Sequence, residues 1–293
     1  MTSRRVVIIG DAMVDIVVQP TEPPAPTSDT SANIRMLRGG SGANIAATLV
    51  AHGHEVTYVA AIGEDLGGAV VRDDLTRCGV VSQLQTCRAS TGTVVVLVAP
   101  DGQRAMMTDR GANRMLSLEF VLHVLDESWD HVHVSGYTVL DSDTRGVARA
   151  ALDVARTRAM TTSVDVCSVA PLADVSAPVF LRACTGASYL FANEEEALEL
   201  AGELDIHRAL ARLGDVFEEV VITRGVRGAM AMRHHVSWGA GAQGDNVVDT
   251  TGAGDAATGA YLSARLRDAP PPMALRSAMA AAANVIRGLG AAG

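Results

Sequence analysis

With 293 residues, 48% hydrophobic content and a formal net charge of −9, the chain has enough apolar material for one large or two smaller globular domains. The acidic balance and the lack of a basic block exclude nucleic acid as a partner, because that binding needs clustered Lys and Arg. No run of about 20 apolar residues is present, and the apolar run after Arg5 is too short for a signal peptide, so we expect a cytoplasmic protein outside the membrane.

All 24 residues counted as Lys and Arg are arginine. A P-loop needs a lysine at the phosphates and a Schiff-base enzyme needs a lysine amine, so both kinds of site are excluded. Any phosphate must therefore be held by backbone N–H groups, arginine or metal. The four cysteines lack a Cys-x-x-Cys pair, which indicates free thiols rather than a disulfide framework or a zinc site.

The first half of the chain begins with a buried strand over residues 6–9 that ends in a turn at Gly10-Asp11. Residues 19–30 are rich in Pro, Thr and Ser and are expected to form a loop. Helical spacing over 43–52 and an apolar run over 56–62 predict the next helix and strand. Two β-rich pieces, 93–99 and 104–108, flank an Asp-Gly hairpin signal.

The second half alternates between the two kinds of element. Strand-like segments at 131–135, 162–166, 189–191 and 220–223 are separated by helical ones, and two Ala-rich helices follow over 253–266 and 273–287. This order predicts a doubly wound, mostly parallel α/β sheet. We expect one domain over residues 1–293, with a small β excursion from segments near 12–20, 32–38 and 91–110.

The strongest chemical signal is a strand that runs into a Gly-rich turn and then a helix, Asp249-Thr250-Thr251-Gly252-Ala253-Gly254-Asp255. The backbone N–H groups of Gly252, Ala253 and Gly254 would form an anion hole at the helix N-terminus, where the helix dipole adds to the attraction. Asp255 falls in the first turn and could take a proton from a hydroxyl held above it. The alternative is that Asp255 only caps the helix.

A second motif, Gly39-Gly40-Ser41-Gly42-Ala43-Asn44-Ile45-Ala46, precedes the Gly-rich turn in the chain. Together the two motifs resemble the two signatures of the ribokinase-like (pfkB) carbohydrate kinase family, and the likeness extends from Val6 to Gly290. This resemblance implies a β lid over the sugar, ATP as phosphate donor, Asp255 as catalytic base, and substrate binding by Asp15, Gly39, Gly40 and Asn44.

The resemblance also implies a nucleotide and cation site. Asn193 and Glu196 match the family's Asn-x-x-Glu element, which organises Mg²⁺ through water, and Mg²⁺ prefers such oxygen ligands. Thr223, Gly225 and Gly228 match a turn on the nucleotide side, where Arg224 could add charge, and the last helix borders adenine through Asn284. In members activated by potassium, Asp249 and Thr251 would provide K⁺ ligands.

Departures from the family pattern leave the acceptor open. Ser41 stands where ribokinases commonly have lysine, and the frequent Asp-x-Asn appears as Asp165-Val166-Cys167. The acidic residues Asp11 and Asp15 favour a neutral polyol, whereas Arg110 could bind the carboxylate of a 2-keto-3-deoxy sugar acid. A nucleoside kinase is a further alternative.

Two readings lie outside the kinases. A sugar- or nucleotide-binding regulator without turnover is an alternative, although such a protein would be free to lose Asp255. A dinucleotide-dependent oxidoreductase is disfavoured, because no Gly-x-Gly-x-x-Gly follows the first strand. Relatives dimerise through the lid, so a homodimer is a further expectation, although the lid segments show no clear apolar stripe.

Overall fold

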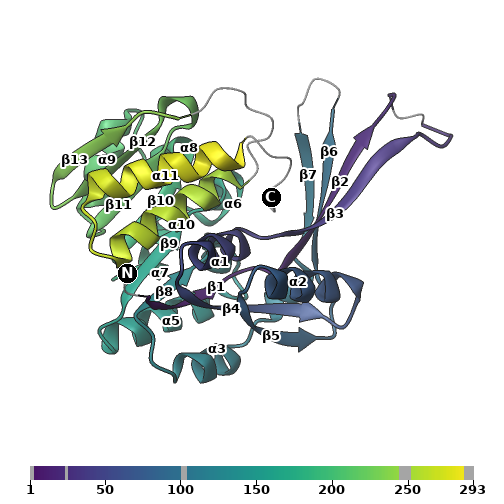
Figure 1. Ribbon diagram of the computed structural model, residues 1–293, viewed down its shortest axis with the longest axis horizontal. Coiled ribbons are helices and arrows are strands. Elements are labelled where there is room, and N and C mark those ends of the chain that lie inside the picture. Colours follow the sequence, from purple (N-terminus) through teal and green to yellow (C-terminus); the bar gives the residue numbers. More distant parts are fainter. Residues whose placement is uncertain (1–2, 24–25, 100–103, 244–251, 287–293) are drawn as a thin grey trace.

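The fold centres on a nine-stranded sheet, seen in a computed structural model that describes residues 3–23, 26–99, 104–243 and 252–286. The strand order is β13-β12-β11-β10-β9-β8-β1-β4-β5 (Figure 1), and every pairing from β11 to β5 is parallel, while β12 and β13 are antiparallel. The strands are β1 Arg5–Ile9, β4 Glu55–Gly63, β5 Val81–Cys87, β8 His131–Val134, β9 Thr161–Asp165, β10 Tyr189–Asn193, β11 Glu219–Thr223, β12 Ala229–Arg233 and β13 Val236–Ala240.

Helices cover both faces of this sheet, which is why its central strands are apolar on both sides. One face packs against α1 Ser41–Ala51, α2 Leu66–Arg77, α10 Ala253–Leu266 and α11 Pro271–Val285. The other packs against α3 Leu118–Leu125, α4 Gly136–Leu140, α5 Arg145–Thr157, α6 Val169–Val175, α7 Ala177–Ala183, α8 Glu194–Ala201 and α9 Ile206–Gly214. Short 3-10 helices, η1 Gly111–Met115 and η2 Gly225–Arg227, complete the described elements.

A second, four-stranded sheet projects from the body at the side of α1 and α2 (Figure 1). Its order is β3-β2-β6-β7, with strands β2 Met13–Pro20, β3 Ala32–Gly39, β6 Gly92–Val98 and β7 Arg104–Asp109. The β2–β6 pairing is parallel and the two outer pairings are antiparallel. We call this sheet the lid, because one of its faces lines the cavity described below.

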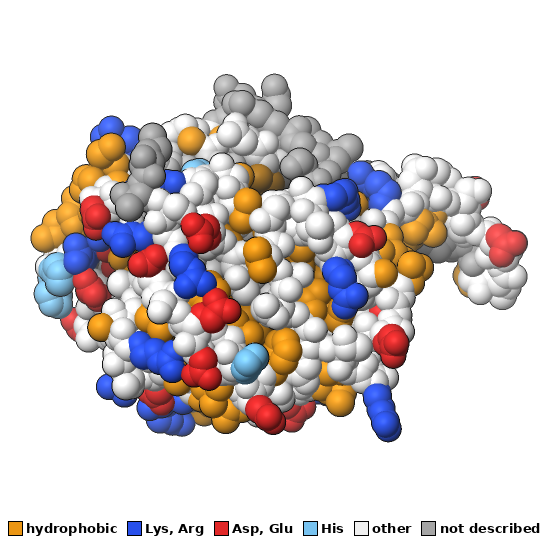
Figure 2. Space-filling model, turned by 60° about the horizontal axis from the view of Figure 1, so that its bottom comes forward, with side chains coloured by type: hydrophobic (Ala, Val, Ile, Leu, Met, Phe, Trp, Pro, Cys, Tyr) orange, Lys and Arg blue, Asp and Glu red, His pale blue; other side chains and the backbone are white. Residues whose placement is uncertain are grey.

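The predicted fold class, a doubly wound and mostly parallel sheet with a small β lid, is confirmed. Helix α10 has the predicted bounds, while α11 begins two residues earlier than expected and ends at Val285. The expected loop over 19–30 overlaps the end of β2, which continues to Pro20. On the face that Figure 2 shows, acidic and basic side chains are interspersed rather than gathered into a block of one sign.

Candidate active site

A cavity of about 1230 Å³ lies between the carboxyl ends of the central strands and the inner face of the lid. Its walls include Asp11 after β1, Asp165 at the end of β9, Asn193 at the end of β10 and Thr223 at the end of β11. Side chains of all four lid strands line the opposite wall. In an open α/β sheet, ligands bind at this carboxyl edge, so the cavity is the candidate active site.

Asp255 lies at the third position of α10 and lines this cavity. The helix begins after Gly252, whose φ of 77° is the left-handed conformation that glycine adopts without strain. The N–H groups of Ala253, Gly254 and Asp255 belong to the first turn and have no carbonyl partner within the helix. An acidic side chain and an anion-binding helix N-terminus thus meet at one point of the cavity wall.

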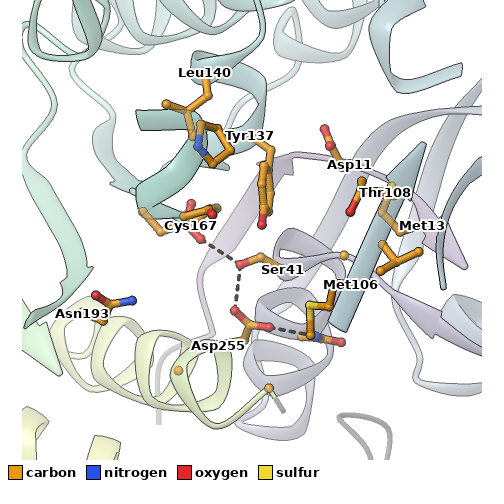
Figure 3. A pocket seen from close by; sticks show the side chains of 18 of the residues that line it. Asp11, Met13, Ser41, Met106, Thr108, Tyr137, Leu140, Cys167, Asn193 and Asp255 are labelled. Atoms are coloured by element: carbon orange, nitrogen blue, oxygen red, sulfur yellow. Dashed lines mark hydrogen bonds between the residues drawn. The ribbon is translucent and has the colours of Figure 1, made fainter. Parts of the chain in front are cut away.

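Both oxygens of the Asp255 carboxylate are held by helix α1. The Ser41 hydroxyl contacts Oδ1 at 2.7 Å and the Asn44 amide nitrogen donates to Oδ2 at 2.8 Å, as Figure 3 shows for Ser41. Residues three apart share one face of a helix, which explains why both reach the same carboxylate. Burial raises the pKa of Asp255 to about 6, while these two hydrogen bonds lower it.

The glycine pair before α1 lets two aspartates approach the backbone. A Cβ atom on Gly39 would lie 2.1 Å from Oδ1 of Asp15, and one on Gly40, whose φ is 94°, would lie 2.2 Å from the backbone oxygen of Asp11. Gly40 and Asp15 line the cavity, and Gly39 lies behind Asp15. Burial raises the pKa of Asp15 to about 6, and the nearby Arg38 charge opposes this shift.

Asn193 and Glu196 form a capping box at the start of α8. The Asn193 side chain accepts from the Glu196 N–H at 2.8 Å, and Glu196 accepts from the Asn193 N–H at 2.9 Å. Burial raises the pKa of Glu196 to about 7. Both residues also line the cavity. Among the residues that the structure describes, no group of three or more His, Cys, Asp or Glu could hold a metal directly.

The other residues expected on the nucleotide side are spread more widely. Thr223 lines the cavity, while Gly225 and Gly228 lie in the η2 turn beyond it and Asn284 is exposed near the end of α11. Arg224 is not among the described residues that line the cavity, and its Nη2 lies 3.5 Å from Oε1 of Glu194. Asp249 and Thr251, the expected potassium ligands, lie outside the described residues.

Arg110 follows β7 and lines the cavity. It donates from Nη2 to Oδ1 of Asp11 at 2.8 Å and from Nη1 to the backbone oxygen of Tyr137 at 2.7 Å, and its Nε lies 3.4 Å from Oδ2 of Asp141. The Arg110 charge is therefore already neutralised by carboxylates of the protein.

Comparison with known proteins identifies the family. The chain matches the pfkB family carbohydrate kinase description over residues 3–293. The chain belongs to the pfkB carbohydrate kinases. It is 28% identical to an ATP-dependent ribose-1-phosphate kinase of Halopiger xanaduensis, over 88% of this chain and 84% of the relative, and 26% identical to a ribokinase of Bacillus subtilis, over 99% and 95%.

Solved structures of the family confirm the fold. A ribokinase of Arabidopsis thaliana, complexed with ribose and ATP, superimposes with a TM-score of 0.82 at 24% identity, covering 99% of this chain and 95% of that one. The chain is accordingly a carbohydrate kinase. No helix within the described ranges is long and apolar enough to cross a membrane.

Two features of this pfkB kinase site were not given roles by the sequence. Ser41 and Asp165 were noted only as departures from the family pattern. In the structure the Ser41 hydroxyl contacts both the Asp255 and the Asp165 carboxylates. Arg38, which precedes the glycine pair, is buried and bonds to Asn44 and Asp74. The one available signal for Ser41 was its spacing of three residues from Asn44.

Proposed function

We propose that this kinase transfers the γ-phosphate of ATP to a hydroxyl of a sugar-like acceptor, with Asp255 as the general base. The observation that carries the proposal is the place of Asp255, in the first turn of α10, lining the cavity, with both carboxylate oxygens held. A positioned carboxylate can take the hydroxyl proton as the oxygen attacks phosphorus. At neutral pH a pKa of about 6 leaves Asp255 ionised and ready to do so.

The phosphoryl group would be stabilised by the turn before this helix. Backbone N–H groups of Gly252, Ala253 and Gly254 supply the anion hole, since the chain has no lysine to do so. On the acceptor side, Asp15 and Asn44 would bind the sugar hydroxyls, while Gly39 and Gly40 give the backbone the room that this arrangement needs.

ATP would lie along the ends of β10 and β11. Asn193, Glu196 and Thr223 face this part of the cavity, with Gly225, Gly228 and Asn284 further out. The two Glu196 oxygens are already bonded to Asn193, so a Mg²⁺ ion between this carboxylate and the phosphates would be held through water, as Mg²⁺ commonly is. Potassium binding through Asp249 and Thr251 stays a prediction from the sequence.

The charge of the cavity favours a neutral acceptor. Seven carboxyl side chains line its described walls (Asp11, Asp15, Asp141, Asp165, Asp174, Glu196 and Asp255) against five arginines (Arg35, Arg38, Arg110, Arg114 and Arg145). Arg110, the residue that could bind the carboxylate of a sugar acid, is paired with Asp11. A neutral sugar or nucleoside therefore fits better than a 2-keto-3-deoxy sugar acid.

Three further expectations belong to the same proposal. We infer a single kinase domain over residues 1–293 and a cytoplasmic location, both from the sequence. We also infer a homodimer, because the strand register of the lid forms an apolar outward face that its separate segments did not reveal in the sequence. That face comprises Ile16, Val18, Ile34, Met36, Val95, Leu97 and Met107, which alternate along the strands with the cavity-lining positions.

The test is an ADP-release screen with ribose, fructose, nucleosides and 2-keto-3-deoxygluconate, run on the wild-type chain and on Asp255→Asn. We expect turnover with a neutral acceptor and a loss of several orders of magnitude in the variant, while calorimetry shows unchanged ATP binding. Turnover of the variant near the wild-type rate would refute the mechanism. Sugar binding without any ADP release by the wild type would instead support a regulator.

A further inference from the structure

The Ser41 hydroxyl bridges the buried carboxylate of Asp165 and the partly buried carboxylate of Asp255. Its Oγ lies 2.7 Å from Oδ1 of Asp255 and 2.8 Å from Oδ2 of Asp165. A hydroxyl has one hydrogen, so at any moment it donates to one of these carboxylates only. The other carboxylate oxygen then faces a lone pair at hydrogen-bond distance, which is favourable only when that carboxyl carries a proton. Asp165 and Asp255 are thus coupled through one side chain.

Asp165 is fixed on its other side by the body of the protein. Its Oδ1 accepts from the Gly136 N–H at 2.8 Å, the residue is 7% exposed, and Nε2 of His133 lies 3.7 Å away without a hydrogen-bond partner. His133 is neutral, since burial lowers its pKa. The Gly136 N–H therefore holds Asp165 in place beside Ser41, and the neutral His133 does not offset the charge of Asp165.

Few other charges face the pair. Arg38 of β3 acts on Asp255, Glu196 of α8 faces both carboxylates, and Asp11 after β1 and Cys167 after β9 face Asp165. Asp165 also interacts with three groups whose pKa is raised by burial, Tyr58 of β4, Tyr137 of α4 and Cys184 after α7. Of these, only Arg38 is a cation, and it is already bonded to Asp74. Asp165 and Asp255 share a hydrogen-bond partner, the Ser41 hydroxyl.

We propose that Asp165 is a positioning residue for catalysis, which acts through the Ser41 hydroxyl to orient the Asp255 carboxylate and to make it a stronger base. The proposal rests on the proposed function of Asp255. In the reaction, the acceptor O–H bond breaks and its proton goes to Asp255, while the acceptor oxygen bonds to the γ-phosphorus and ADP leaves. The negative charge of Asp165 nearby strengthens the hold of Asp255 on that proton.

Asp165→Asn tests the proposal with little change of shape. The amide keeps an oxygen for the Gly136 N–H and offers its NH₂ to Ser41, but the charge is lost. We expect the acid limb of kcat/KM, which falls as pH drops through the pKa of Asp255, to move to lower pH by about one unit. Asp174→Asn, which removes a charge elsewhere on the cavity wall, is the matched control for the position of this limb.

Ser41→Ala should shift the acid limb of kcat/KM in the opposite direction from Asp165→Asn. It removes a hydrogen bond that lowers the pKa of Asp255, so its acid limb should move to higher pH, and Ser41→Thr, which restores the hydroxyl, should return the limb. A purely structural role for Asp165 would lower kcat without moving the limb. An unmoved limb in Asp165→Asn, or shifts of the same sign in Asp165→Asn and Ser41→Ala, would overturn the proposal.

The experiments distinguish a failure of the proposed role of Asp165 from a failure of the proposed role of Asp255 as general base. If Asp255→Asn abolishes turnover while the limb of Asp165→Asn stays in place, only the role of Asp165 is refuted. If Asp255→Asn turns over at the wild-type rate, the general base itself is wrong.

Discussion

Arg38 donates a 2.8 Å hydrogen bond from Nη1 to the side-chain oxygen of Asn44. This bond settles which end of the amide faces Asp255, because the oxygen is occupied and the nitrogen must point to the carboxylate. Arg38 is itself buried at 3% exposure and ion-paired with Asp74 of α2. The orientation of Asn44, which bonds to the proposed base, is thus fixed by a buried charge on the cavity wall.

Arg38→Met should therefore lower both stability and turnover. The variant leaves Asp74 buried with Arg77 as its remaining ion-pair partner, which we expect to cost about 3 kcal/mol in the free energy of unfolding, measured by urea titration. It also frees the Asn44 amide, so we expect kcat to fall about tenfold, the value of one lost hydrogen bond. The double variant Arg38→Met, Asp74→Leu should recover stability but not kcat. Recovery of both would show that Arg38 acts on the fold alone.

Gly39→Ala should impair acceptor binding through Asp15. The added Cβ would lie 2.1 Å from the Asp15 carboxylate, so the Asp15 side chain must move to another position. We expect the acceptor KM to rise by about the same factor as in Asp15→Ala, with a much smaller change in the KM for ATP. The combined variant should be no worse than either single one, because both remove the same contact. Additive losses in steady-state kinetics would contradict this account.

The sequence predicted the elements of this kinase better than it predicted their contacts. Buried apolar runs such as 6–9 define parallel strands, and the Gly-rich turn before Ala253 places Asp255 in the first turn of a helix by local geometry alone. The bridge from Ser41 to Asp165 spans 124 residues, and the bond from Arg38 reaches another element, so no spacing rule reports them. Only the fold brings these side chains together.

The sequence likewise did not reveal which arginines are already ion-paired with carboxylates of the protein. The sequence left open whether Arg110 binds a substrate carboxylate and whether Arg224 adds charge at the phosphates. The structure pairs Arg110 with Asp11 and turns Arg224 to Glu194. A residue's type and approximate position follow from its motif, whereas its partners depend on which strands end beside it.

Glu196→Gln should weaken Mg²⁺ use without unfolding α8. Glutamine at this position still supports a capping box, so we expect the thermal midpoint to change little. The Mg²⁺ concentration for half-maximal turnover should rise by about tenfold, measured at pH 8, where a carboxyl with a pKa of about 7 is mostly ionised. Glu195→Gln, an exposed carboxylate on the same turn, is the control. Equal Mg²⁺ dependence in both variants would exclude Glu196 from the metal site.

The outward face of the lid supports a prediction about assembly. Within it Ile34, Met36 and Met107 are 64%, 47% and 56% exposed, and the strand register brings Ile16 opposite both Met36 and Val95. Hydrophobic side chains are visible on the projecting lid in Figure 2. A contiguous apolar face of this kind on a projecting sheet is usually covered by a partner, and a second copy presents a matching apolar surface.

We therefore expect the wild-type chain to sediment as a dimer and Met36→Glu to sediment as a monomer, because a charge at the centre of the face would have to be buried without a partner. Leu204→Glu places the same charge on a fully exposed leucine between α8 and α9 and should leave the dimer intact. Since Met36 points away from the cavity, any loss of kcat in the Met36→Glu monomer would show that the second copy steadies the lid over the acceptor. A dimer that persists in Met36→Glu would rule out this face as the interface.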